Sequence, residues 1–154
     1  MGLGDISVLV FFGWLSVAGT YYLQAGTFDS VVMLPATACG FLATAVLNIN
    51  NLRDIENDAI NGKNTLAVRL GPIKARYYHV GLLVGSVVCL ALFALLYLKS
   101  AFGWLFVLAI PMLYKHGHYV FTHRTPEAMR PMLESMVKSA LLTNVLFAIG
   151  TVLS

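Results

Sequence analysis

The sequence NINNLRDIENDAINGKNTLAVRLG, residues 48–71, is the most polar stretch of a chain that is otherwise largely apolar. It places three acidic and three basic residues directly after an apolar run. Asn50, Asp54 and Asp58 are spaced four residues apart, so on one continuous helix their side chains would share a face. Two carboxylates one helical turn apart repel each other. A cation between them would remove the repulsion, and we therefore expect this stretch to bind one.

The composition around this stretch is that of an integral membrane protein. Of 154 residues, 58% are hydrophobic and 11% are charged, whereas about a quarter of the residues of a soluble domain are charged. The apolar runs are long and continuous, which favours membrane-spanning helices over the alternating strands of a barrel. The sequence predicts an all-α, multi-pass transmembrane bundle of about five helices, formed by a single domain over residues 1–154.

Five apolar segments are expected to span the membrane: Ile6–Leu23, Val31–Leu47, Tyr77–Leu98, Ala101–Tyr114 and Met136–Leu153. The fourth is short for a span, so we expect it to continue through Tyr119–Phe121, with the Lys115 amine extended toward the membrane surface. Gly81 and Gly85 are four residues apart in the third segment, and this spacing of small residues predicts that another helix packs closely there.

The distribution of basic residues predicts how the chain is threaded. Nine of the ten lysines and arginines fall in or beside the two loops that follow the second and fourth segments, and only Lys99 falls between the third and fourth. Because basic residues collect on the cytoplasmic side, we expect residues 48–76 and the amino terminus in the cytoplasm. The net charge of +3 then reflects membrane topology and gives no reason to expect nucleic-acid binding.

The polar stretch contains the groups that magnesium and phosphate require. Magnesium is held by one or two carboxylates, keeps several waters and takes further ligands from substrate phosphates. Asp54 and Asp58 would supply the carboxylates, and Asn50 an amide oxygen. Positive charge suited to phosphate oxygens would come from three basic residues, namely Arg53, Lys63 and Arg69.

Asn61-Gly62 predicts a turn that brings Lys63 back toward the two carboxylates. A P-loop is excluded at Gly62-Lys63-Asn64, because the first glycine of that motif and the Ser or Thr after its lysine are missing. The alternative interpretation is an ordinary polar loop at the membrane surface, in a membrane subunit without catalytic activity or in half of a transporter.

Residues 50–71 resemble the second aspartate-rich motif of the UbiA superfamily of intramembrane prenyltransferases. The likeness is greatest to the branch that prenylates 1,4-dihydroxy-2-naphthoate in menaquinone synthesis, and it extends along essentially the whole chain. The other stretches that carry it are Gly2-Leu3-Gly4-Asp5, Phe11-Phe12-Gly13, Pro35-Ala36-Thr37 and Met129-Arg130-Pro131-Met132-Leu133-Glu134.

The resemblance implies transfer of a polyprenyl group from polyprenyl diphosphate to the naphthoate, with loss of carbon dioxide, to give demethylmenaquinone at a bacterial inner membrane. Mg²⁺ held by Asp54 and Asp58 would bind the diphosphate, and Lys63 would stabilise its departing charge. The implied substrate-binding residues are Asn50, Asn51, Arg53, Arg69 and Asp5. Asp5 has a second interpretation of equal weight, as the N-cap of the first helix.

The family carries a second magnesium motif, rich in Asn and Asp, on an earlier helix, and residues 1–49 contain no such motif. The chain is therefore expected to correspond to the carboxyl-terminal five helices of a nine-helix protein about twice as long. For activity we expect it to need the amino-terminal half or, less directly, a second copy of itself.

Three histidines gather near the end of the fourth segment. His116 and His118 are two residues apart, so on a helix their rings point in different directions, and His123 follows nearby. We expect them to lie at the membrane interface as ordinary polar residues, with no role as ligands of one metal ion.

Overall fold

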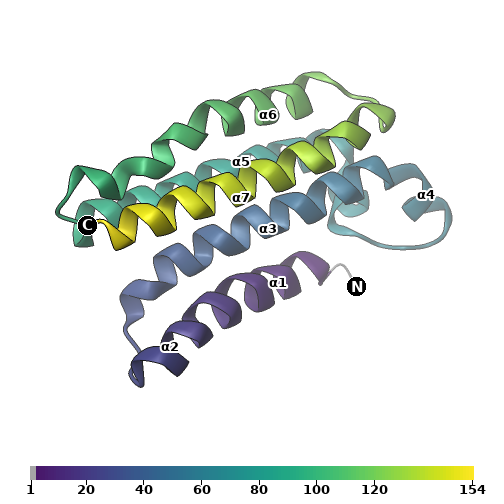
Figure 1. Cartoon of the computed structure of the whole chain (residues 1–154). Coiled ribbons are helices and arrows are strands. Elements are labelled where there is room, and N and C mark those ends of the chain that lie inside the picture. The colour runs from purple at the N-terminus through teal and green to yellow at the C-terminus, as the bar shows by residue number, and fades with distance from the viewer. Residues whose placement is uncertain (1–2) are drawn as a thin grey trace.

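A computed structural model describes residues 3–154, and every regular element in that range is helical. Four helices are long and apolar enough to cross a membrane, and they cover Gly4–Ala25, Ser30–Arg53, Leu66–Tyr97 and Glu127–Val152. The protein is thus a helical membrane bundle (Figure 1), as the sequence predicts.

Each apolar run forms a longer helical unit than its hydropathy alone indicates. The first unit comprises α1 (Gly4–Val8), the π-helix η1 (Leu9–Ala18) and α2 (Gly19–Ala25), and the second comprises η2 (Ser30–Val32) and α3 (Met33–Arg53). After the short α4 (Ile55–Ile60) comes α5 (Leu66–Tyr97). The chain ends with η3 (Ala101–Ala109), α6 (Ile110–Thr122), η4 (Glu127–Met129) and α7 (Arg130–Val152).

In the third and fourth helical units, the ends of the helices differ from the ends of the apolar segments expected from the sequence. α5 begins at Leu66, eleven residues before the expected span, and its backbone breaks once, at Gly71 with φ 76° just before Pro72. The fourth unit continues past Tyr114 to Thr122, as expected, and Lys115 on α6 is exposed. α1 begins at the end of the bundle where α4 lies, whereas α7 ends at the opposite end (Figure 1).

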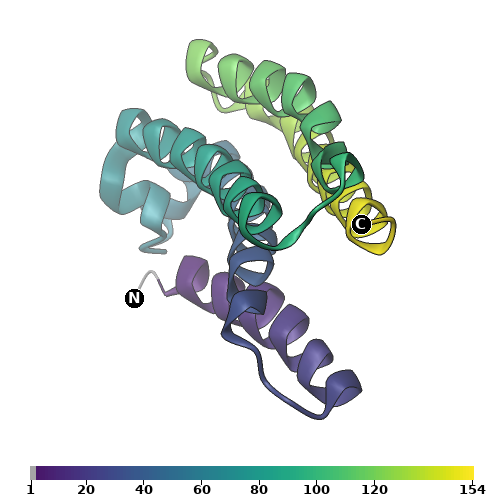
Figure 2. The ribbon, with the colours of Figure 1, turned by 90° about the vertical axis from the view of Figure 1, so that its left-hand side faces the viewer.

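Helix α3 occupies the centre of the bundle. It packs against α5, against η1 and against α7, and the view in Figure 2 shows it between the first helical unit and the α6–α7 pair. The central part of the core combines α3 residues with residues of α5, α6 and α7, among them Leu42, Ile49, Leu52, Leu82, Leu83, Val120 and Met136.

Two glycines bring the first unit into backbone contact with α3. A Cβ atom added to Gly13 would lie 2.7 Å from the Ala36 carbonyl oxygen and 2.8 Å from the Gly40 Cα. Beside this contact, the Trp14 indole Nε1–H donates to the Thr37 hydroxyl at 3.0 Å. Side chains larger than hydrogen at positions 13 and 40 would therefore separate the two helices.

The expected close contact at Gly81 and Gly85 is correct for one residue and wrong for the other. A Cβ atom at Gly85 would lie 2.9 Å from the ring of Phe41 on α3. Apart from the adjoining residues of its own helix, no atom of the described chain lies within 4 Å of a Cβ atom built at Gly81. The two glycines are four residues apart, about 40° around the helix, and only Gly85 points toward α3.

Candidate functional site

The polar stretch is not one continuous helix. α3 ends at Arg53, and Asp54, with φ −99° and ψ 7°, separates it from the six-residue α4. The prediction that Asn50, Asp54 and Asp58 share one face of a helix is therefore wrong. The break is confined to one residue, because the Asp54 N–H still donates to the Asn50 carbonyl at 3.1 Å and the Asp58 N–H to the Asp54 carbonyl at 2.8 Å.

The Asp54 carboxylate is bound by the guanidinium of the preceding residue. Arg53 donates from Nε to Asp54 Oδ1 at 2.8 Å and from Nη2 to Asp54 Oδ2 at 2.6 Å. The same Nη2 donates to Asn50 Oδ1 at 2.7 Å. These hydrogen bonds from Arg53, helped by its charge, hold the pKa of Asp54 below its ordinary range.

The Asp58 carboxylate has a different partner and less contact with solvent. Lys63 Nζ lies 3.2 Å from Asp58 Oδ1 and 3.3 Å from Oδ2. The Asp58 side chain is 11% exposed, compared with 32% for Asp54. Each acid of the predicted pair is therefore neutralised by its own base.

The predicted turn at Asn61-Gly62 is confirmed. Gly62 has φ 70°, a left-handed conformation that favours glycine. The turn returns the Lys63 N–H to the Asp58 carbonyl at 2.8 Å, and it brings the Lys63 amine to Asp58 but not to Asp54.

The remaining candidate residues divide between two hollows at this end of the bundle. The first, called the amide hollow, has a volume of about 380 Å³ and is lined by Asp5, Asn50, Asn51 and Lys63 with Gly4, Leu47, Gly62, Asn64, Thr65 and Leu66. The second, called the arginine hollow, has a volume of about 210 Å³ and is lined by Arg53, Asp54 and Arg130 with Glu56, Asn57, Pro126 and Glu127. Arg69 is exposed on α5 and lines neither of them.

Asp5 belongs to the amide hollow and is not a helix cap. It is the second residue of α1, whose N-cap is Leu3, and no side chain caps this helix. Asp5 is 6% exposed, and its Oδ1 atom has no hydrogen-bond partner among residues 3–154. The N-cap interpretation is therefore wrong, and the interpretation in which Asp5 faces a site agrees with its position in the hollow.

The oxygen atoms of Asn50 and Asp54 are better arranged to bind a magnesium ion than those of Asp58. Asn50 Oδ1 and Asp54 Oδ2 converge on a single cationic atom, Arg53 Nη2. Two oxygen donors around one positive atom form a donor set that magnesium accepts. Asp58 is turned toward Lys63 instead, and the described residues contain no group of three or more His, Cys, Asp or Glu side chains arranged around one point.

Sequence reasoning missed Arg130 and Tyr78. Arg130, at the start of α7, reaches the arginine hollow because η4 packs against α3. Tyr78 on α5 lies beside the Asp5 carboxyl group. Arg130 could have been found from the sequence, because it lies in the stretch Met129–Glu134, which carries part of the family resemblance. Tyr78 could not, because its contact depends on how α1 and α5 pack.

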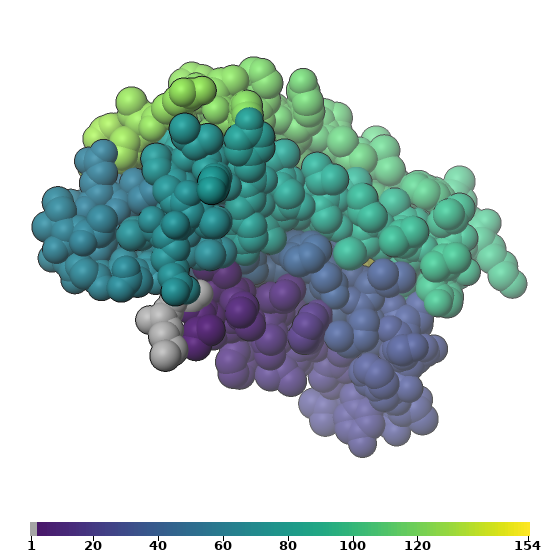
Figure 3. All heavy atoms as spheres, turned by 180° about the vertical axis from the view of Figure 1, so that it is seen from behind, coloured from purple at the N-terminus to yellow at the C-terminus, as the bar shows by residue number. Residues whose placement is uncertain are grey.

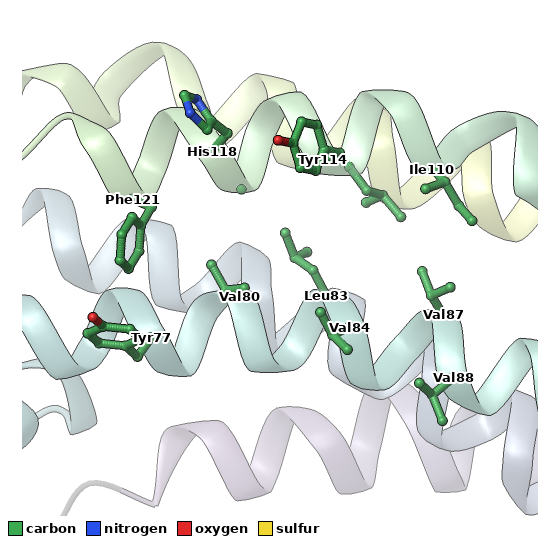
Figure 4. Close-up of a pocket in the computed structure, with 12 residues that line it drawn as sticks. Tyr77, Val80, Leu83, Val84, Val87, Val88, Ile110, Tyr114, His118 and Phe121 are labelled. Atoms are coloured by element: carbon green, nitrogen blue, oxygen red, sulfur yellow. The ribbon is translucent and has the colours of Figure 1, made fainter.

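A larger hollow lies away from the polar stretch, between α5 and α6. It has a volume of about 530 Å³, and its lining is almost wholly apolar along α5, from Tyr77 to Val88. Figure 4 shows Phe121 of α6 close to Tyr77 at one end of the groove and Ile110 opposite Val87 at the other. The groove has the chemistry of a surface that contacts hydrocarbon.

The expectation for His116 is wrong, because this residue is buried against a second histidine. His79 Nε2 of α5 lies 3.1 Å from His116 Nε2 of α6, and His116 Nδ1 lies 3.3 Å from the hydroxyl of Ser135 on α7. The pair therefore joins three helices. His118 is exposed beside Tyr114.

Comparison with known proteins gives one family. Residues 1–148 match the UbiA prenyltransferase family. A protein of Escherichia coli, 1,4-dihydroxy-2-naphthoate octaprenyltransferase, is 66% identical over 154 residues, which are 100% of this chain and 50% of that protein. The protein of the same name from Haemophilus influenzae is 56% identical over 97% of this chain and 49% of its own length.

Relatives at lower identity match a shorter part of the chain. The octaprenyltransferase of Mycobacterium tuberculosis is 50% identical over 53% of this chain and 28% of its own length. The chain spans about half the length of these Escherichia coli and Haemophilus influenzae relatives. No solved structure matches the chain.

Proposed function

Because the chain belongs to the UbiA prenyltransferase family, we propose that it forms one half of an enzyme that prenylates 1,4-dihydroxy-2-naphthoate. The reaction transfers a polyprenyl group from polyprenyl diphosphate to the naphthoate with loss of carbon dioxide and leads to demethylmenaquinone. The names and high identity of the two relatives matched along all or nearly all of the chain support this substrate pair. The structural observation that carries the proposal is the convergence of Asn50 and Asp54 oxygens on one cation.

The proposed roles follow from the charges of the polar stretch. Asp54 and Asp58, with Asn50, would hold Mg²⁺ at the diphosphate, and this metal would supply positive charge to the leaving group. Arg53, which now donates to Asp54, would supply its guanidinium to the diphosphate oxygens. Lys63 adds a second positive charge to the departing diphosphate.

The apolar helices contribute the second requirement of the reaction. An allylic cation formed in water would be hydrolysed, so the bundle must exclude water around the isoprenoid chain. Residues 48–76 lie at the end of the bundle where α1 begins, and we assign that end to the cytoplasmic side of a bacterial inner membrane, following the excess of lysine and arginine there. The relatives are twice as long, so the active site also requires the half that this chain does not cover.

A hybrid enzyme tests the proposal. These 154 residues replace the matching half of the Escherichia coli relative, and membranes are assayed for prenylation of the naphthoate with and without magnesium. We expect magnesium-dependent turnover that falls roughly a hundredfold or more in Asp54→Asn. Asp29→Asn, in the loop between the first two spans, is the control and should keep full activity. A hybrid without turnover contradicts the proposal and favours a non-enzymatic membrane subunit.

A further inference from the structure

Asp5 differs from the other two acids that were expected in the site. Asp54 and Asp58 are each neutralised by a neighbouring base, Arg53 and Lys63. No salt bridge reaches Asp5 within residues 3–154, although only 6% of the residue is exposed. Its Oδ1 atom is buried and accepts no hydrogen bond from those residues. A buried carboxylate oxygen without a partner is costly, and a ligand that donates a hydrogen bond to it would remove the cost.

The position of Asp5 is fixed by its contacts with two other helices. The Thr44 hydroxyl of α3 lies 3.5 Å from the Asp5 carbonyl oxygen, and Tyr78 of α5 lies beside the carboxyl group. Further along the same helical unit, the contact between Gly13 and Gly40 fixes its rotation against α3. Asp5 is thus held toward the bundle on the side of the amide hollow.

The other groups of the amide hollow complement a hydroxylated aromatic acid. Asn50 and Asn51 offer amide donors and acceptors, and Lys63 offers a cation whose three N–H groups are not all used by Asp58. A hollow of about 380 Å³ accommodates a two-ring aromatic molecule. Figure 3 shows, from behind, that α4 and the beginning of α5, coloured blue to teal, lie next to the purple start of α1.

We infer that Asp5 binds the hydroxyl group of the aromatic acceptor and takes its proton, while Lys63, placed between the two substrates, faces the acceptor's carboxylate as well as the departing diphosphate. This inference rests on the proposed function, since it assigns the acceptor to the amide hollow and leaves the metal and the diphosphate to Asp54, Asp58 and Asn50, with Lys63 between the two substrates. Among the described residues, Asp5 is the acid that lines this hollow, and no salt bridge neutralises it. Tyr78 contacts its carboxyl group, but Oδ1 remains without a partner, and a carboxylate oxygen that is still available can accept a proton from a phenol.

The proton balance of the reaction follows. As the bond between the allylic carbon and the diphosphate oxygen breaks, the electron pair leaves with the diphosphate. The ring carbon that carries the carboxylate forms the new carbon–carbon bond, and the neighbouring hydroxyl gives its proton to Asp5. Carbon dioxide then leaves, its bonding pair restores the aromatic ring, and Asp5 returns the proton to the ring oxygen. The product of these steps is the quinol form.

The hybrid enzyme tests this assignment through the two substrates separately. We expect Asp5→Asn to lower kcat/KM for the naphthoate by about 10²- to 10⁴-fold, while KM for polyprenyl diphosphate and the magnesium requirement stay unchanged. The acidic limb of the pH profile of kcat/KM should also disappear in Asp5→Asn. Glu134→Gln, which changes an exposed acid on α7, is the matched control. Turnover within threefold of the unsubstituted hybrid, or an equal loss toward both substrates, would overturn the inference.

A binding measurement on the 154-residue chain in lipid nanodiscs separates this inference from the proposed function. Quenching of Trp14 and Trp104 fluorescence reports binding of 1,4-dihydroxy-2-naphthoate and of its 1,4-dimethoxy analogue, which has no hydroxyl proton to donate. We expect the chain to bind the dihydroxy compound at least tenfold more tightly, and Asp5→Asn to abolish this preference. Equal affinity for both compounds, or a preference retained in Asp5→Asn, overturns the role of Asp5 even if the hybrid is active. A preserved preference in an inactive hybrid overturns only the proposed function.

Discussion

Arg53 controls the chemistry of Asp54 in the resting protein. Its two hydrogen bonds to Asp54, at 2.6 and 2.8 Å, form a fork that matches the planar carboxylate. Because both groups are about one third exposed, solvent weakens this pair, and its main effect is on charge and position. The guanidinium therefore keeps Asp54 ionised and holds it beside Asn50.

The effect of Arg53 on Asp54 can be measured directly. The folded-state pKa of Asp54 lies below its ordinary value of 3.8, so the pair stabilises the fold above that pH. This stabilisation is lost as the pH falls through the lowered pKa. We expect Arg53→Gln to raise the Asp54 pKa toward the ordinary value, as followed by ¹³C NMR of the carboxyl carbon. Arg69→Gln serves as the control and should leave the titration unchanged, and an unchanged titration in Arg53→Gln would contradict this account.

At the scale of single residues, the sequence predicted the kinds of groups in the site better than their pairing. The Asn61-Gly62 turn could be predicted because left-handed glycine turns depend on neighbouring residues. The division of Asp54 and Asp58 between two bases could not, because four-residue spacing presumes a helix that continues through Asp54.

At the scale of helices, the contact between η1 and α3 depends on shape. Gly13 and Gly40 allow backbone atoms to touch, and one hydrogen bond, from Trp14 to Thr37, lies beside them. In a bilayer such close packing drives association, because lipid chains are as apolar as the side chains they replace.

A substitution at Gly13 tests this packing. We expect Gly13→Val to push η1 away from α3 and to lower the free energy of unfolding by about 1–3 kcal/mol, the usual cost of overpacking. Unfolding in sodium dodecyl sulfate, followed by the fluorescence of Trp14, measures the change. Gly19→Val lies in the same helical unit where a Cβ atom meets open space, so it should cost much less. Equal stability of the two variants would contradict the importance of the Gly13 contact.

The packing of the helices explains which element-level predictions failed. The positions of the apolar runs followed from hydropathy, since each span needs about 20 apolar residues. The His79–His116 contact was not predictable, because it joins α5 and α6 across 37 positions of sequence. The same holds for Arg130 at the arginine hollow.

At the scale of the whole molecule, the bundle separates a polar end from an apolar body. The polar hollows lie near the start of α1, whereas the groove between α5 and α6 is apolar. The sequence indicated this separation through the positions of its lysines and arginines. It could not indicate how the polar residues divide between two hollows, because α1 reaches one hollow, and α4 and η4 the other, only in the folded chain.

Chemical labelling tests the orientation of the bundle. Asn61→Cys and Thr27→Cys are made separately in a chain whose Cys39 and Cys89 have been replaced by alanine, since both target positions are exposed. We expect a membrane-impermeant maleimide to label Thr27→Cys in intact spheroplasts and Asn61→Cys only after lysis, because basic residues near Asn61 favour the cytoplasm. The reverse pattern would contradict the assigned topology.

The backbone contact between Gly13 and Gly40 sets the rotation of the first helical unit about its own axis. A uniformly apolar helix could rotate in the bilayer with little change in free energy. A helix with a gap in its surface at Gly13 packs closely against Gly40 at one rotation angle. Eight residues away, this angle helps to determine, together with the contacts of Thr44 and Tyr78, whether Asp5 faces the bundle or the lipid. A larger side chain at position 13 would thus turn the Asp5 carboxylate away from the amide hollow, although the two positions are about 12 Å apart along the helix axis.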